Sequence, residues 1–184
     1  MNSNYFKLIL KLLKCKYGKK LLLKGMPIVF NKRGAKISFG DNVTIKSSFL
    51  SNLVGLYSRT VIVTRCPESE IIIGNNVGIS GATIYARERI TIGDNTLIGG
   101  NVKILDNDFH PLDAEARKKD DKSKILSEPI TIGKNCFIGC NSIILKGTVL
   151  GDNCIVGAGA VVAGRFPEGS VIVGNPARLI SKGE

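Results

Sequence analysis

His110 is the only histidine of the chain, and it lies in the segment DNDFHP, residues 106–111. An imidazole is the side chain whose ordinary pKa lies nearest neutral pH, which makes it the usual general base of an enzyme. Asp106 and Asp108 stand just before it, and either carboxylate, or equally a backbone carbonyl, could orient the ring. With one histidine and no C-x-x-C pair, the chain lacks the usual ligand sets of zinc, so we expect no metal centre.

An internal repeat organises the rest of the chain and must position this segment. The five copies are FGDNVTI (39–45), IGNNVGI (73–79), IGDNTLI (92–98), IGKNCFI (132–138) and LGDNCIV (150–156). Each begins and ends with an apolar residue, and its Gly and Asn suit the strained backbone of a tight corner. After residue 131 an aliphatic residue recurs every six positions as far as Val162. This hexapeptide rule predicts an all-β solenoid in which three short faces make one coil.

The spacing of the copies locates one interruption. Copies at 132 and 150 are 18 residues apart, which is one coil, whereas copies at 92 and 132 are 40 apart, which is one coil plus 22 residues. Residues 105–129 contain no hexapeptide match, so we predict that a loop over residues 106–128 leaves the solenoid and returns. Long irregular loops in compact domains are usually functional or disordered. The loop that carries His110 is therefore the first candidate for a site.

The five cysteines divide by position. Cys136 and Cys154 are 18 residues apart, so we expect them to stack as structural thiols at the same inner corner of adjacent coils. Cys140 follows FIG at an outward-leaning position beside the place where the loop returns. The sequence shows no signal peptide and no stretch of transmembrane length, so we expect free thiols in a reducing cytoplasm.

The net charge of +11 is concentrated near the N-terminus. Residues 1–40 hold ten Lys and Arg and no acid, whereas the remaining chain has 16 bases against 15 acids, which disfavours a nucleic-acid-binding domain. We assign residues 1–36 to a basic amphipathic helix and cap, residues 37–173 to the solenoid, and residues 174–184 to a C-terminal tail. The helix is expected to cover the open first coil or to rest on an anionic membrane surface, and both can hold.

Together these features resemble a known family. The hexapeptide pattern, the DNDFHP loop and the run from IGKNCFIGC to GNPARLI are similar to the hexapeptide-repeat acetyltransferases, above all the O-acetyltransferases of bacterial surface polysaccharides, with galactoside and xenobiotic acetyltransferases as cousins. The resemblance covers roughly residues 37–180. It implies a left-handed parallel β-helix, a departure from the usual right-handed crossover. It also implies a homotrimer that binds acetyl-CoA along the groove between subunits.

The resemblance assigns roles residue by residue. His110 matches the family's general base, and Cys140, beside Gly139, matches a backbone N–H that faces the thioester oxygen. The expected contacts to CoA come from Ala158 and Ala163 for the pantetheine arm and from Arg178 for the phosphates. Many relatives have VVTKDIP where this chain has VVAGRFP (161–167), so Arg165 is a second candidate for the phosphates. Tyr85 and Asn107 are further candidates for contact with the acceptor.

The implied reaction is direct transfer of an acetyl group from acetyl-CoA to a hydroxyl of a sugar or surface-polysaccharide precursor, without a metal. A hydroxyl is a weak nucleophile near neutral pH, which explains the need for a base. Three alternatives stay open: an amino-sugar N-acetyltransferase that uses a nucleotide-linked acceptor, a covalent route through Cys140, and a non-enzymatic structural β-helix. The expected location is the cytoplasm, with contact to the inner face of the membrane if the N-terminal helix binds lipid.

Overall fold

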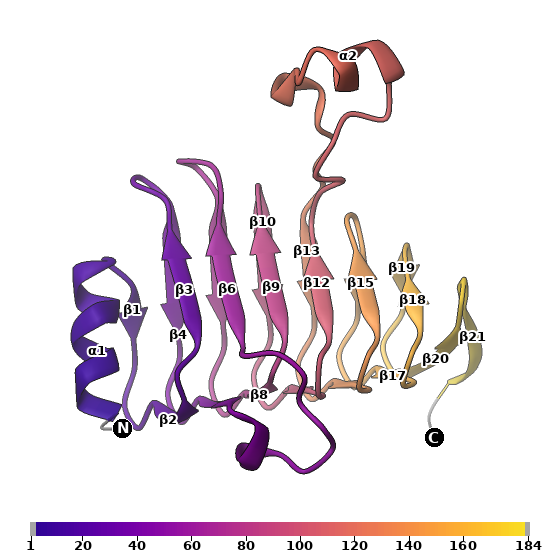
Figure 1. Ribbon diagram of the computed structural model, residues 1–184. Helices are drawn as coiled ribbons and strands as arrows, with labels where there is room; N and C mark the ends of the chain where they lie inside the picture. The colour runs from indigo at the N-terminus through magenta and orange to yellow at the C-terminus, as the bar shows by residue number, and fades with distance from the viewer. Residues whose placement is uncertain (1–2, 183–184) are drawn as a thin grey trace.

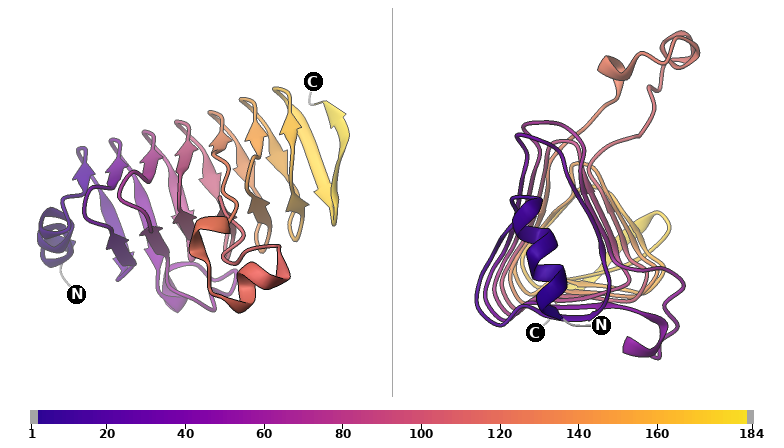
Figure 2. Two further views of the ribbon diagram at one scale, coloured as in Figure 1. Left: turned by 90° about the horizontal axis from the view of Figure 1, so that it is seen from above. Right: turned by 60° about the vertical axis from the view of Figure 1, so that its left-hand side comes forward.

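The computed structural model describes residues 3–182 and shows a three-sided coil in which each side is one sheet (Figures 1 and 2). Sheet A contains β1 (Lys16–Tyr17), β4 (Lys36–Phe39), β7 (Glu70–Ile73), β10 (Arg89–Ile92), β13 (Ile130–Ile132), β16 (Val149–Leu150) and β19 (Arg165–Phe166). Sheet B contains β2 (Leu22–Gly25), β5 (Thr44–Ser47), β8 (Gly78–Ser80), β11 (Leu97–Ile98), β14 (Phe137–Ile138), β17 (Ile155–Val156), β20 (Ser170–Gly174) and β21 (Ala177–Lys182). Sheet C contains β3 (Ile28–Asn31), β6 (Val61–Thr64), β9 (Thr83–Ala86), β12 (Lys103–Leu105), β15 (Ile143–Leu145) and β18 (Val161–Val162).

The chain visits sheets A, B and C in turn, and its neighbouring strands are parallel except at the C-terminal hairpin. The fold is the predicted left-handed parallel β-helix. Its core is a stack of β-branched and aliphatic side chains; Ile84, Ile104 and Ile144, for example, are completely buried in successive strands of sheet C. Strands of two to four residues suffice because, from β4 to β18, each buries one or two side chains against the other two sheets.

The repeated asparagines form the corner between sheets A and B. Asn42, Asn76, Asn95, Asn135 and Asn153 all have a left-handed φ, between 55° and 61°. Each of the first four donates a side-chain hydrogen bond to the Asn of the next coil, over 2.9 to 3.1 Å. The motif therefore specifies both the corner conformation and a polar ladder along the solenoid.

The N-terminal helix α1 (Ser3–Leu12) covers the open first coil, as the end-on view shows (Figure 2, right). Phe6 and Leu10 are 5% and 1% exposed and belong to the core. The coil itself begins at Lys16 rather than at the predicted boundary of residue 37, since β1, β2 and β3 pair in parallel with β4, β5 and β6. Within residues 3–182, no helix has both the length and the hydropathy needed to cross a bilayer.

Two loops leave the coil, at different corners of the triangle (Figure 2, right). Residues 106–129, between β12 and β13, contain α2 (Ala114–Lys118) and the short 3₁₀ helix η2 (Lys122–Lys124). The second loop, residues 48–60 between β5 and β6, contains the 3₁₀ helix η1 (Phe49–Ser51) and was not predicted. Residues 48–60 are called the β5–β6 loop below.

The C-terminal segment continues the solenoid beyond Val162, where the hexapeptide pattern ends. Phe166 of β19 packs against the core, and Ile172 of β20 is completely buried. The predicted tail is largely strand β21, which turns back at the cis Asn175–Pro176 bond and pairs with β20 in the antiparallel sense. This hairpin closes the last coil.

Candidate active site

His110 follows β12 at the base of the extruded loop, where side chains hold the backbone. Asn107 Oδ1 accepts a hydrogen bond from the backbone N–H of Phe109 at 2.9 Å. Phe109 has a left-handed φ of 62°, and its ring centroid lies 4.8 Å from that of Tyr85. The His110 backbone N–H donates to the carbonyl oxygen of Asp108 at 2.7 Å, and the residue is exposed. The loop base therefore presents the imidazole outside the coil from a constrained backbone.

Asn107 and Tyr85, the two candidates for contact with the acceptor, differ in how accessible their side chains are. Asn107 is only 5% exposed; its Nδ2 donates to Asp106 Oδ1 at 3.1 Å, and its Oδ1 is taken by Phe109. The structure thus gives Asn107 a role in holding the loop base, because its amide faces inward. Tyr85 lies on the outer face of sheet C, half-buried against Phe109.

Asp106, one of the two residues predicted to orient the imidazole, is engaged by the backbone of another corner. Its side chain is completely buried, and its oxygens accept the backbone N–H groups of Arg87 and Glu88, each at 2.8 Å. Burial raises the pKa of this carboxyl, and those hydrogen bonds oppose the rise. Asp106 therefore fixes the corner between β9 and β10, where the repeat copies at 73 and 92 are 19 residues apart, one more than a regular coil.

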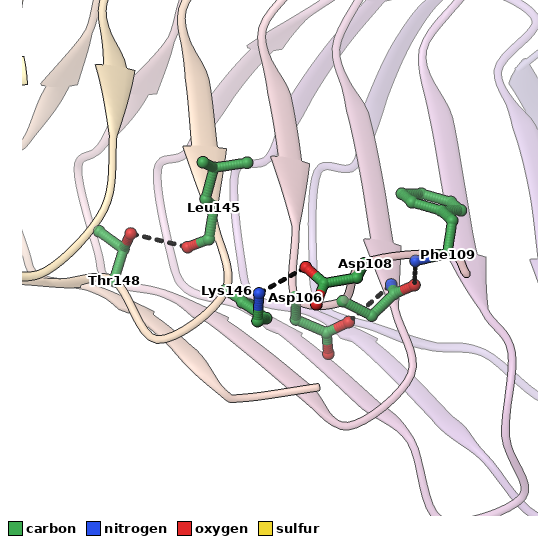
Figure 3. Close-up of polar contacts among 7 residues, drawn as sticks. Asp106, Asp108, Phe109, Leu145, Lys146 and Thr148 are labelled. Carbon is green, nitrogen blue, oxygen red and sulfur yellow. Dashed lines mark hydrogen bonds and ion pairs between the residues drawn. The ribbon is translucent and has the colours of Figure 1, made fainter. Parts of the chain in front are cut away.

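Asp108 is the other predicted orienting residue, and it forms an ion pair with Lys146 (Figure 3). Lys146 directly follows β15, one coil further along the solenoid. The ion pair is partly buried, with side-chain exposures of 29% for Lys146 and 18% for Asp108. Asp108 Oδ2 is buried and accepts no hydrogen bond from residues 3–182. One buried carboxylate oxygen two residues before His110 is thus available as an acceptor.

Gly139, Cys140 and Ala158 lie together at the corner between sheets B and C. A β-carbon on Gly139 would stand 2.5 Å from the backbone nitrogen of Ala158, so only glycine allows this close stacking. The Cys140 carbonyl accepts the N–H of Gly159 at 2.9 Å, whereas its own N–H donates to no backbone or side-chain acceptor in residues 3–182. An uncommitted backbone donor at this corner fits the predicted role toward a thioester oxygen.

The remaining CoA candidates are spread over the C-terminal coils. Ala163 follows β18 at the corner between sheets C and A, and it is exposed. Arg165 projects from β19 of sheet A, and Arg178 from β21 of sheet B; both are exposed. The two guanidinium groups are therefore on different sheets, and one chain does not bring them into a single cluster.

His110 and Cys140 lie at opposite edges of sheet C. His110 comes after the carboxyl end of β12, whereas Cys140 comes before the amino end of β15, and these two strands are paired in parallel. The width of the sheet therefore separates the base from the backbone donor. A single chain holds both halves of the predicted site without bringing them together.

The thiols follow the predicted division. Cys136 and Cys154 are buried at equivalent corners, with Cys136 Sγ 3.3 Å from Gly151 O and Cys154 Sγ 3.2 Å from Pro167 O. Burial raises the pKa of Cys136 to about 11, as it does for Cys15 beneath α1. Cys140 is half-buried at the surface.

Sequence reasoning missed Lys146 and the β5–β6 loop. Asn101, which is 3% exposed, fixes this loop: its Nδ2 donates to Gly55 O at 2.9 Å, and its Oδ1 accepts Tyr57 N–H at 3.2 Å. A β-carbon on Gly100 would lie 2.7 Å from Val54 Cγ1 and 4.0 Å from Cys140 Cβ. The loop therefore folds over the corner directly beside Cys140. The signal in the sequence that could have revealed this loop is the lack of a hexapeptide match in residues 48–60.

Known proteins match the same parts of the chain. A family model described as the hexapeptide repeat of succinyl-transferase matches residues 89–104 and 129–163, on either side of the extruded loop. The chain is 41% identical over 113 residues to galactoside O-acetyltransferase of Escherichia coli K12, a match that covers 61% of this chain and 54% of that protein. It is 31% identical over 157 residues to the putative lipopolysaccharide biosynthesis O-acetyl transferase WbbJ of the same strain, covering 82% of this chain and 74% of the relative.

A solved structure of galactoside acetyltransferase in complex with coenzyme A matches with a TM-score of 0.62 and 26% identity, covering 99% of this chain and 73% of that one. The match to WbbJ extends over most of both chains, so this chain belongs to the hexapeptide-repeat acetyltransferases, as the resemblance implied. The chain spans about half the length of galactoside O-acetyltransferase.

Proposed function

We propose that this protein transfers an acetyl group from acetyl-CoA to a hydroxyl of a sugar or surface-polysaccharide precursor. The observation that carries the proposal is the exposed His110 on a backbone constrained by Asn107 and Phe109, in a chain of this family. The relatives' names, galactoside O-acetyltransferase and lipopolysaccharide biosynthesis O-acetyl transferase, support a carbohydrate hydroxyl as the acceptor. The CoA-bound structure of galactoside acetyltransferase supports acetyl-CoA as the donor.

In the proposed mechanism, His110 removes the hydroxyl proton while the oxygen attacks the thioester carbonyl. A C–O bond forms, the C–S bond breaks, and the proton passes from the imidazolium to the departing CoA thiolate. A positioned base typically contributes about 10²–10⁴-fold to the rate. The Cys140 N–H stabilises the oxyanion, a contribution of roughly 3–4 kcal/mol for such a donor.

Asp108 is proposed as the positioning residue of His110. Lys146 holds one of its oxygens, and the other is buried without a hydrogen bond, so it can accept an imidazole N–H once a substrate orders the ring. Asp106 is left out of the mechanism because backbone donors occupy both its oxygens.

The separation of His110 from Cys140 supports a site shared between copies of the chain. One copy offers the edge between sheets C and A, and its neighbour offers the edge between sheets B and C. An interface between two different surfaces is heterologous, and it forms a ring when the rotation between copies closes; a rotation of one third of a turn would give a homotrimer. Ala158, Ala163, Arg165 and Arg178 are proposed to line the CoA groove of such an assembly.

We also propose a cytoplasmic location with peripheral membrane contact through the exposed face of α1. The apolar face of α1 formed by Phe6 and Leu10 is used in the core, which leaves Leu8 and Leu12, 55% and 74% exposed, beside Lys7 and Lys11. These four residues are the part of α1 that could meet an anionic lipid surface.

The test is acetyl transfer measured as CoA release with panels of hydroxyl sugars and amino sugars. We expect the His110→Ala variant to lose about 10²–10⁴-fold in turnover while CoA still raises its melting temperature. Near wild-type turnover of His110→Ala would contradict the assignment of the base. A preference for amino sugars would replace O-transfer with the N-acetyltransferase alternative. Loss of activity in Cys140→Ser, with an acetylated Cys140 in the wild type, would replace direct transfer with the covalent route.

A further inference from the structure

A groove of about 410 Å³ lies on the outer face of sheet B, over strands β5, β8, β11 and β14. Its lining includes Gly78, Ser80 and Gly99, whose small or missing side chains leave a depression in the outer surface of the sheet. Lys46 and Ser80 are paired in register, and Gly99, which directly follows β11, continues this row on the next coil. The groove therefore crosses several coils in the direction of the solenoid axis.

Lys46 gives the groove a cation without a protein partner. Lys46 is half-buried, and its Nζ makes no ion pair in residues 3–182. Lys24 is its register partner on the neighbouring strand β2, and like charges directly opposite each other in a sheet are unfavourable. Residues 42–67 contain no acid, and Oδ1 of Asp41, just before them, accepts the N–H of Lys19. An anion bound at Lys46 would relieve this repulsion.

The other end of the groove is suited to the face of a sugar ring. Leu97 and Phe137 are adjacent in register and are 53% and 48% exposed, so they form an apolar ledge. Asn42, Asn52 and Asn76 line the groove. Asn42 and Asn76 each use one amide N–H in the asparagine ladder, and Asn52 accepts the N–H of Val54, so each side chain keeps an amide N–H for a sugar hydroxyl. An apolar platform with a few polar groups around it is the usual composition of a small-molecule site.

The groove leads to the proposed reaction centre. A β-carbon on Gly99 would stand 2.8 Å from the backbone nitrogen of Cys140, the proposed oxyanion donor. A sugar on the ledge would therefore have hydroxyls close to the thioester, with its anionic group directed back toward Lys46.

The β5–β6 loop borders the groove and adds an apolar surface. Asn52 of the loop lines the groove. Its neighbours Phe49, Leu50 and Leu53 are 71%, 88% and 87% exposed. Such a cluster of exposed large apolar side chains is unusual on a soluble surface and points to an apolar ligand group.

We propose that this groove binds a phosphate-linked sugar as the acceptor, with the sugar ring on Leu97 and Phe137 and the phosphate on Lys46. The inference rests on the proposed function, because it names the substrate class of the same reaction. The phosphate could belong to a nucleotide or to an isoprenoid lipid carrier, and the exposed apolar residues of the β5–β6 loop favour the lipid.

The test is calorimetric titration of the full-length protein, saturated with CoA so that the CoA-phosphate groups are already occupied. Uridine diphosphate and farnesyl diphosphate are the two probes, and farnesol is the uncharged control. We expect at least one diphosphate to bind, Lys46→Ala to weaken it by about tenfold or more, and Lys46→Arg to retain most of the affinity. Lys36→Ala is the matched control, because it removes a lysine that pairs with Glu70 on sheet A.

If farnesyl diphosphate binds more tightly than both farnesol and uridine diphosphate, the acceptor is lipid-linked. If uridine diphosphate binds more tightly than farnesyl diphosphate, the acceptor is nucleotide-linked. Absence of binding by both diphosphates, or equal affinity in wild type and Lys46→Ala, would overturn the inference. Thermal stabilisation by CoA is measured on every variant. A protein that CoA stabilises but that binds neither diphosphate contradicts this inference alone, whereas absence of any CoA effect contradicts the proposed function.

Discussion

Replacing Asp106 by alanine should destabilise the fold rather than remove a catalytic group. The substitution leaves the backbone N–H groups of Arg87 and Glu88 without the acceptors they now reach at 2.8 Å. An orphaned buried donor costs about 1–3 kcal/mol, and since Arg87 is half-buried and Glu88 exposed, water can replace part of the loss. We therefore expect the free energy of unfolding to fall by about 2–4 kcal/mol in total. Asp106→Asn keeps one acceptor oxygen and should fall by roughly half as much.

The assay is urea unfolding at a fixed protomer concentration, with Asp121→Ala as the control. Asp121 also accepts a backbone N–H, that of Ser123, but it does so in the exposed loop, so its loss should leave the midpoint nearly unchanged. The folded Asp106→Asn protein should keep its acetyl-transfer rate. Unchanged stability together with a large loss of rate would contradict the structural role and return Asp106 to the mechanism.

The pH dependence of the same variants gives an independent check. Burial raises the pKa of Asp106 above its unfolded value, so the folded state binds this proton more tightly than the unfolded state does. Wild-type stability relative to Asp106→Asn should therefore increase as the pH falls through the folded-state pKa toward the unfolded value of about 4. A relative stability that decreases over this interval would show that the hydrogen bonds outweigh the burial.

Two further predictions concern the β5–β6 loop and the thiols. Asn101→Ala removes the two hydrogen bonds from this side chain to the loop, so limited proteolysis should cut within residues 48–60 much faster. Unchanged cleavage would show that the remaining contacts, among them the Ser58 hydroxyl donating to Gly81 O, are enough to fix the loop. At pH 8 in the folded protein, a thiol reagent should modify Cys140 well before Cys136, since burial raises the pKa of Cys136 to about 11; equal rates would contradict the burial of the inner thiol.

The solenoid could be predicted because its rules are local. Each corner requires an Asn or Gly with a suitable backbone, and each face requires one large apolar residue, so spacing alone places Cys136 over Cys154 and separates the extruded loop from the coil. The first coil escaped prediction because β1 and β2 carry outward lysines and because the corners between β1, β2 and β3 lack the motif. Their assignment depends on pairing with later strands, which is a long-range contact.

The roles of the polar residues around His110 could not be predicted from their order in the chain. DNDFHP places three polar side chains at consecutive positions, but only the three-dimensional structure shows that Asp106 and Asn107 face inward and that Asp108 meets Lys146, which lies 38 positions later. Lys46 was missed for the same reason, since its surroundings on sheet B come from four separate coils.

The central claim is that one copy supplies His110 and its neighbour supplies the Cys140 corner, and mixing two inactive variants tests it most directly. His110→Ala lacks the base, and Ala158→Trp fills the exposed corner beside Cys140. The two variants are refolded together in equal amounts, so that copies assemble at random. About one quarter of the sites should then combine an intact His110 from one copy with an intact Cys140 corner from its neighbour, and about a quarter of the wild-type activity should return. If the mixture assembles but stays as inactive as its two components, the site lies within a single chain and the account is wrong.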